Sequence, residues 1–125
     1  NTDNAELLRA EEETAQFLRE IAEGEGVSIT TKTLARFDPV QFDERVISIV
    51  HETAELLGNT VQRMPSGAGH DPQMLARVCP SGMIFVPSVK GISHNPAEHT
   101  DVSDLQAGAD ILLQTMLSLT TASFS

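Results

Sequence analysis

The chain has 125 residues, enough for one modest domain, and 40% of them are hydrophobic, as in a globular protein. Its formal net charge of −10, from 18 acidic and 8 basic residues, argues against nucleic acid and anionic membranes as partners. No apolar run approaches the length of a membrane-spanning helix. The single cysteine, Cys79, excludes an internal disulfide and favours a reducing compartment, so we expect a cytoplasmic protein and interpret Cys79 as structural. The chain begins without Met and with a helix cap almost at once, so we expect that upstream sequence is missing.

Residues 1–35 predict one helix followed by one strand. Asp3 with Glu6 is typical of a capping box, and the pattern predicts a helix to about Glu23, ended by the glycines at 24 and 26. The many glutamates of this helix indicate a solvated face. Residues 27–34 alternate β-branched and polar side chains, which favours a strand. Two elements cannot form a sheet, so we expect the missing strands to lie upstream or in a partner chain.

A domain boundary is expected in the linker 36–42, where Pro39 forces its predecessor into an extended conformation. Asp43 then caps a second predicted helix that runs to Leu57 and is ended by Gly58. His51 on this helix has no partner at i+4 and is interpreted as a surface residue. The buried stripe is expected to consist of Val46, Ile49, Val50, Ala54 and Leu57.

Two short segments are predicted to be strands, and each leads into a glycine-rich loop that presents a histidine. Residues 61–64 precede S-G-A-G-H-D, and residues 83–86, a continuous apolar run, are expected to be buried on both faces. Asp71 is predicted to cap a short helix that begins at Pro72. The loop glycines are expected to adopt positive φ and to let the backbone approach a ligand closely; they are Gly67, Gly69 and Gly91.

The last predicted element is a helix that runs to about Thr121, with Ser103 and Gln106 as its capping box. Helix, strand, helix, strand, helix over 43–121 is an α/β pattern, in which loops at the carboxyl ends of strands form the site crevice. We therefore expect the loops of His70 and His94 to form one wall of an active site. The core face of the last helix is expected to consist of Leu105, Ala109, Leu112, Leu113, Met116 and Leu119.

The residues alone leave a metal role for His94 open. A complete zinc site needs three or four ligands, and no helix carries two histidines at ligand spacing. A histidine held by hydrogen bonds in a loop is the alternative. The chain has neither the G-x-S-x-G nucleophile elbow nor the Gly-Lys-Ser/Thr ending of a phosphate loop. The possible ligands around these loops are His94, His70, Asp71, Glu98 and Asp101.

Four motifs in sequence order resemble the C-terminal part of the hydantoinase/carbamoylase family of amidohydrolases. They are P-S-G-A-G-H-D, M-I-F-V-P-S, G-I-S-H-N-P-A-E-H-T and D-L-x-A-G-A-D-x-L-L. The family includes N-carbamoyl-L-amino acid hydrolases, β-ureidopropionases and allantoate amidohydrolases. The resemblance covers essentially the whole chain. It implies that residues 36–125 are the C-terminal half of an α/β, two-metal aminopeptidase-like (phosphorylase/hydrolase-like) catalytic domain, and that residues 1–35 are the last helix and strand of an α+β lid or dimerisation domain.

The resemblance also implies an activity, which is metal-dependent hydrolysis of a linear C–N amide in N-carbamoyl amino acids or related ureido compounds. It makes His94 a metal ligand and places Gly67, Gly69 and His70 against the substrate. The other metal ligands and the catalytic glutamate would come from the family's N-terminal half, so this chain alone is expected to be inactive and not to hold two zinc, manganese or cobalt ions. The implied partners are the small substrate and a second copy that pairs through the lid segment.

Two other functions fit the same residues. One is a non-catalytic dimerisation or binding module that reuses the fold, and the other is a metallopeptidase of that fold. The motifs G-A-G-H-D and G-I-S-H-N-P favour the carbamoylase branch over the peptidase. An H-x-D metal motif and paired glutamates upstream in the gene would distinguish an enzyme from a module.

Overall fold

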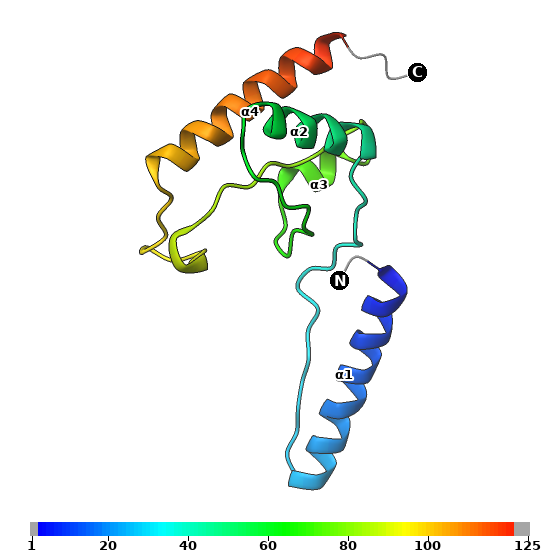
Figure 1. Ribbon diagram of the computed structural model, residues 1–125. Helices are drawn as coiled ribbons and strands as arrows, with labels where there is room; N and C mark the ends of the chain where they lie inside the picture. The colour runs from blue at the N-terminus through cyan, green and yellow to red at the C-terminus, as the bar shows by residue number, and fades with distance from the viewer. Residues whose placement is uncertain (1–2, 122–125) are drawn as a thin grey trace. The chain divides into compact units, whose positions relative to one another are not determined.

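A computed structural model describes residues 3–121, which divide into two compact units at the junction of Gln41 and Phe42 (Figure 1). This junction lies in the predicted linker; that the units are a lid and part of a catalytic domain stays a prediction. The helices of the described part are α1 (Asn4–Glu25), α2 (Glu44–Leu56), α3 (Asp71–Leu75), α4 (Val102–Thr121) and the 3-10 turn η1 (Val89–Gly91).

The first unit begins with α1, as predicted. The Asp3 side chain accepts a hydrogen bond from the Ala5 N–H at 2.8 Å and so caps the helix. The helix ends two residues later than predicted, because Gly24 stays helical and Gly26 supplies the left-handed cap with φ +63°. Hydrogen-bonded and ion-paired side chains at i, i+3 and i, i+4 cover its outer face, which confirms the solvated face.

Residues 27–34, predicted as a strand, run beside α1 as an extended trace without forming one (Figure 1). A strand requires a neighbour to complete its hydrogen-bonded ladder, and the described part of this unit offers only a helix. Arg36 fixes the segment by donating to the Glu11 carboxylate at 3.2 Å, to Asn4 Oδ1 at 3.1 Å and to Asp38. The hydrogen bonds to the carboxylates, first to Asp38 and then to Glu11, raise the pKa of Arg36.

The second unit is built on the contact of α2 with α4. The side chain of Asp43 caps α2 by accepting from the N–H groups of Arg45 at 2.9 Å and Val46 at 3.2 Å, as predicted. Gly58 follows the helix with φ +79°. Of the predicted stripe, Leu57 is exposed, because the side of α2 that meets α4 includes Thr53 instead. The buried residues of this unit are Val46, Thr53, Ala54, Ile111 and Thr115.

The Asp43 cap makes the stability of α2 pH-dependent. The Arg45 side chain and the capped N–H groups hold the pKa of Asp43 below its ordinary value of 3.8. The cap therefore contributes its full stability above that value and loses it as the pH falls through the lower, folded pKa. We expect Asp43→Asn, which keeps a capping oxygen, to lose less helical circular dichroism than the wild type between neutral pH and pH ~2. Equal losses in the two chains would show that the ionised cap is not involved.

Residues 61–64 and 83–86 are not strands either, and the second run is not buried on both faces, since Phe85 is 47% exposed. The reason is again that the described residues supply no neighbouring strand. The second run nevertheless joins the two helices. A methyl group on Gly82 would lie 2.8 Å from Val46 Cγ1 on α2, and one on Gly108 of α4 would lie 2.5 Å from Val86 Cγ1. At the start of the run, the backbone at Gly82 therefore lies close to the Val46 side chain of α2. At its end, the Val86 side chain lies close to the backbone of α4 at Gly108.

The starts of α3 and α4 correct two capping predictions. Asp71 is the first residue of α3 rather than its cap, and His70 holds the cap position without a side-chain hydrogen bond. α4 begins at Val102, two residues earlier than a Ser103 cap allows, and the N–H groups of Asp104 and Leu105 bond to the Asp101 carbonyl. Ser103 and Gln106 therefore lie inside the helix and form no capping box.

The predicted core face of α4 is mostly exposed. Ile111 and Thr115 are the buried residues of the helix, whereas Leu113 is 54% exposed. Apolar residues occur all around this helix, as in a helix that is covered on several sides. In this chain α2 covers one side. The large apolar residues left exposed on α4 are Val102, Leu105, Leu112, Leu113, Met116 and Leu117.

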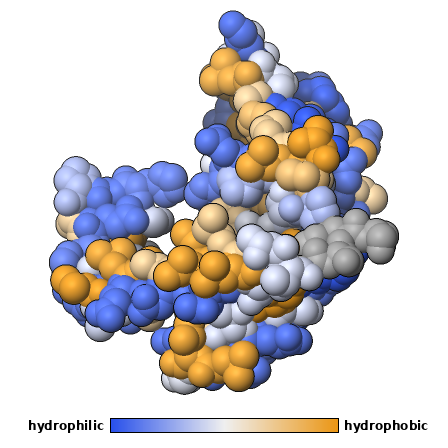
Figure 2. All heavy atoms as spheres, turned by 90° about the horizontal axis from the view of Figure 1, so that it is seen from above, coloured by the Kyte–Doolittle hydropathy of each residue, from blue (hydrophilic) through white to orange (hydrophobic). Residues whose placement is uncertain are grey.

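Figure 2 shows patches of hydrophobic side chains among hydrophilic ones on the surface. None of the helices in the described part is both long enough and apolar enough to cross a bilayer.

Candidate functional site

The loop from Ser88 to Thr100 is closed by short-range hydrogen bonds. The Val89 N–H donates to the His99 carbonyl at 2.8 Å, which joins the two ends of the loop. The Ser88 hydroxyl donates to the Ile92 carbonyl and lies 3.4 Å from the His99 carbonyl. Gly91 adopts the predicted positive φ, +66°, next to Lys90 at +60°. This closed loop holds His94 near its tip.

His94 has a backbone conformation that is unusual for a residue with a side chain. Its φ is +53°, in the left-handed region, and its side chain is exposed. Its N–H donates to Glu98 Oε2 at 2.9 Å. Non-glycine residues in this region are enriched at functional sites, where the surrounding structure holds them.

A tight turn brings Glu98 back to His94. The Glu98 N–H donates to the Asn95 carbonyl at 2.9 Å, and the Ala97 N–H donates to Asn95 Oδ1 at 2.9 Å. Asn at the first position and Pro96 at the second are the residues that such a turn favours. From the sequence, Glu98 was expected only as a possible metal ligand. Its hydrogen bond to the His94 backbone was missed, although the dipeptide Asn-Pro followed by an acceptor side chain is typical of such a turn.

The second predicted loop, residues 66–70, has open space beside its two glycines. His70 makes an edge contact with Phe85, with ring centroids 6.4 Å apart and ring planes at 67°. Gly67 and Gly69 have nothing within 4 Å of an added Cβ, and neither has positive φ, so that part of the prediction is wrong for both. The loop instead contains a short turn, in which the Ala68 N–H donates to Ser66 Oγ at 3.3 Å. The space beside both glycines therefore remains free.

The two loops bring no complete metal centre together. No hydrogen bond or ring contact joins His70 to His94, and residues 3–121 contain no group of three or more metal-ligating side chains. His94 suits the role of a single ligand, because its imidazole is exposed while its backbone is fixed. Further ligands would have to come from other polypeptide.

The other histidines belong to ordinary surface pairs. His51 does have a partner at i+4, contrary to the prediction from sequence, since its Nε2 lies 3.4 Å from Glu55 Oε1. His99 is 67% exposed, and its Nε2 lies 3.6 Å from Asp101 Oδ1. Neither geometry assembles ligands around a shared centre.

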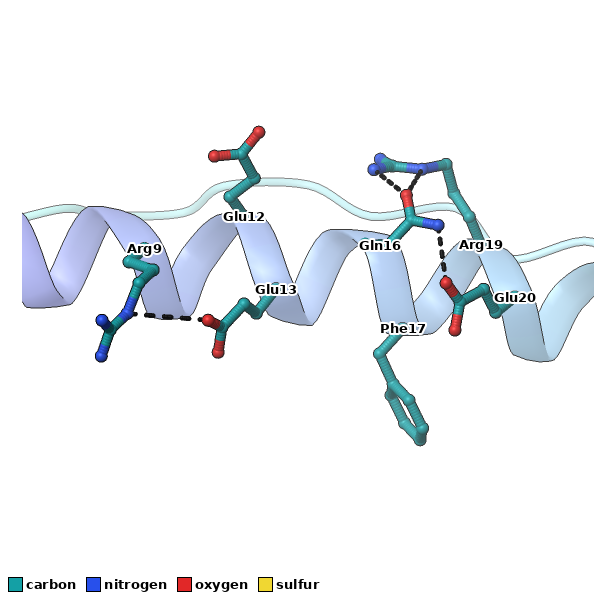
Figure 3. A pocket seen from close by; sticks show the side chains of 7 residues that line it. All are labelled: Arg9, Glu12, Glu13, Gln16, Phe17, Arg19 and Glu20. Carbon is teal, nitrogen blue, oxygen red and sulfur yellow. Dashed lines mark hydrogen bonds and ion pairs between the residues drawn. The ribbon is translucent and has the colours of Figure 1, made fainter.

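A shallow depression on α1 is a surface feature of a single helix (Figure 3). Arg9 pairs with Glu13 at 3.6 Å, and Gln16 donates to Glu20 at 2.7 Å along the same helix. Such exposed pairs stabilise a helix by a few tenths of a kcal/mol each. Its walls come from one element, so it encloses no ligand. The lining residues are Arg9, Glu12, Glu13, Gln16, Phe17, Arg19 and Glu20.

Comparison with known proteins relates the chain to hydrolases. The sequence pattern described as peptidase family M20/M25/M40 matches residues 7–118. An N-carbamoyl-L-amino-acid amidohydrolase of Rhizobium meliloti is 41% identical over 78% of this chain and 23% of its own length. An allantoate amidohydrolase of Bacillus subtilis is 39% identical over 75% of this chain and 23% of its own length.

A solved structure supports the same relationship. An amidase of the hydantoinase/carbamoylase family from Burkholderia multivorans superposes with a TM-score of 0.86 at 37% identity, over 94% of this chain and 29% of that one. The chain therefore spans about a quarter of the length of the curated relatives that it matches.

Proposed function

This chain belongs to the peptidase family M20/M25/M40, and we propose on that basis that it is the C-terminal part of a longer metal-dependent amidohydrolase, here called the parent protein. The observation that carries the proposal is His94, an exposed imidazole on a left-handed backbone that a neighbouring carboxylate holds. The order of the four sequence motifs and the short coverage of the relatives support it.

The proposed reaction is hydrolysis of a linear C–N amide in an N-carbamoyl amino acid or a related ureido compound. The names of the two curated relatives support this substrate class over a peptide. Two divalent ions (zinc, manganese or cobalt), when bound, would supply Lewis acidity at the scissile carbonyl. His94 would contribute one ligand, and the remaining ligands and the catalytic glutamate would come from the rest of the parent protein.

A chelator should abolish carbamoyl hydrolysis by the parent protein, and a divalent metal should restore it; activity that survives chelation would contradict the proposal.

The 66–70 loop is proposed to meet the substrate, with Gly67 and Gly69 beside its carboxylate or ureido group and His70 close by. The free space beside the two glycines supports this, because none of the described residues fills it. Backbone N–H groups in such a loop suit an anionic group.

Gly69→Val tests this wall. We expect the variant in the parent protein to lose kcat/KM at least tenfold while its unfolding midpoint changes little, because the side chain enters space that no described residue fills and that we assign to the substrate. Gly24→Val, at another glycine with nothing near an added Cβ, is the control for the substitution itself. A normal kcat/KM would remove the loop from the substrate wall.

The first unit is proposed to end an α+β lid that pairs two copies of the parent protein, with residues 27–34 joining a sheet of that lid. The exposed apolar side chains along this segment support the proposal, since Leu34 is 87% exposed.

We expect the 125-residue chain to self-associate in sedimentation experiments at micromolar concentration. Ile29→Pro, which removes a ladder N–H, should dissociate it. A wild-type chain that sediments as a monomer would contradict the pairing.

A further inference from the structure

Glu98 stands out among the polar groups of the described residues because its carboxylate bonds to a strained backbone rather than to a cation. The Glu98 side chain accepts from the His94 N–H at 2.9 Å, while its own N–H closes the turn onto the Asn95 carbonyl. Glu98 therefore closes the turn through its backbone and holds His94, the residue just before the turn, through its side chain.

The chemistry of this contact suits a restraint. A left-handed backbone is unfavourable for a residue with a Cβ, so it persists where a neighbouring group stabilises it. A hydrogen bond to an ionised carboxylate is about twice as strong as one between neutral groups. The bonded atom belongs to the residue whose φ is strained, so losing the bond releases the backbone on which the imidazole is mounted.

We propose that Glu98 is a positioning residue that holds the His94 backbone in the left-handed conformation and so aims its imidazole at the metal. This inference rests on the proposed function for its metal consequence, but the backbone restraint does not require a metal. Glu98 acts through His94 and touches neither metal nor substrate in this role. The residues of H-N-P-x-E then act in distinct ways, since Asn95 and Pro96 form the turn and Glu98 returns to His94.

The restraint can be measured in the 125-residue chain without metal. We expect Glu98→Ala to speed hydrogen exchange of the His94 amide and to change its N–H to Cα–H coupling constant, which reports φ. Glu98→Gln keeps an acceptor oxygen and should restore both values most of the way. Glu12→Ala, which removes a carboxylate from the surface of α1, is the matched control. If the His94 amide is unchanged in Glu98→Ala, the restraint is disproved.

The metal consequence is measured in the parent protein with Co²⁺ or Zn²⁺ alone, by titration and by the absorption spectrum of bound Co²⁺. Loss of a residue that orients a ligand typically weakens metal binding by about 10–100-fold. We expect about a tenfold rise in Kd for Glu98→Ala and a value within about threefold of the wild type for Glu98→Gln. Rescue by glutamine separates positioning from direct ligation, because a neutral amide does not replace a carboxylate ligand.

The two proposals fail in different ways. A His94→Ala parent that binds metal like the wild type would overturn the ligand role of His94 and with it the metal consequence of Glu98, while the amide measurement would still decide the restraint. If His94→Ala loses metal but Glu98→Ala does not, the positioning inference is overturned and the ligand role stands. Equal losses in Glu98→Ala and Glu98→Gln would make Glu98 a ligand and would also overturn it.

Discussion

Replacing His94 by alanine in the parent protein is expected to remove bound metal and reduce carbamoyl hydrolysis by at least a thousandfold. A dinuclear centre has few ligands to spare, and loss of an imidazole leaves an open coordination position that water fills less strongly. The stability of the loop should change little, because the contact that His94 makes through its backbone N–H survives in alanine. Metal content per subunit and hydrolysis rate should be measured on the same sample.

The matched control is His99→Ala in the same loop. His99 is exposed, and its side chain pairs with Asp101, while its carbonyl, which closes the loop, remains in the variant. It should retain metal and most of its activity. Comparable losses in both variants would point to general damage to the loop, and wild-type metal content in His94→Ala would remove His94 from the centre.

Gly108→Ala is expected to lower the free energy of unfolding of the second unit by about 1–2 kcal/mol. Alanine in a helix interior normally gains up to about 1 kcal/mol over glycine. Here the added methyl would lie 2.5 Å from Val86 Cγ1, closer than two carbons can approach, and overpacking costs about 1–3 kcal/mol. The collision should win because Val86 has one stiff rotatable bond with which to move aside. Urea unfolding followed by helical circular dichroism would measure the difference.

Two further variants separate the collision from helix propensity. Gly24→Ala makes the same change in α1, where nothing lies within 4 Å of the new methyl, and it should stabilise its helix slightly. Val86→Ala combined with Gly108→Ala should recover most of the loss, because the methyl then enters the space that Val86 vacates. If Gly108→Ala stabilises the chain as Gly24→Ala does, the close packing of α4 on Val86 is contradicted.

The helices of this chain could be predicted because their signals are local. Asp43 followed by a periodic apolar stripe and Gly58 defined α2 to within one residue. The start of α4 was wrong because Ser103 with Gln106 matches a capping box in sequence, whereas the chain enters the helix from the Asp101 carbonyl. A side-chain motif does not determine which residue closes the first backbone hydrogen bond.

The strands and the buried face of α4 could not be predicted, because both depend on partners, whereas Val46 and Ala54 of α2 are buried as predicted. Residues 83–86 have a strand-like composition, but ladder hydrogen bonds require a neighbour that the described residues do not supply. Leu112 and Leu113 were assigned to the core for their hydrophobicity, yet one side of α4 meets α2 and that side carries Ile111 and Thr115. Hydrophobicity alone does not show which side of a helix will pack against a neighbouring element.

The sequence placed His94 in a loop, as the structure shows, but the hydrogen bonds that shape this loop could not be predicted from it. The family resemblance singled out His94, while composition could not show that its φ is positive or that Glu98 bonds to its N–H. Gly67 and Gly69 were expected to adopt positive φ, but in this part of the chain the positive φ values belong to Gly91, as predicted, and to Lys90 and His94, which were not foreseen.

The hydrogen bonds that shape the His94 loop have a consequence for how it folds. They join residues four or fewer positions apart within the turn, and the loop is closed from Val89 to His99. Chain closure over about ten residues takes on the order of 10–100 ns, far less than the assembly of a sheet. The geometry of this loop is therefore encoded in about a dozen consecutive residues. Under the proposed function, a metal ion that arrives after the rest of the parent protein has folded would meet a histidine whose backbone entropy was lost beforehand, and this preorganisation would strengthen binding.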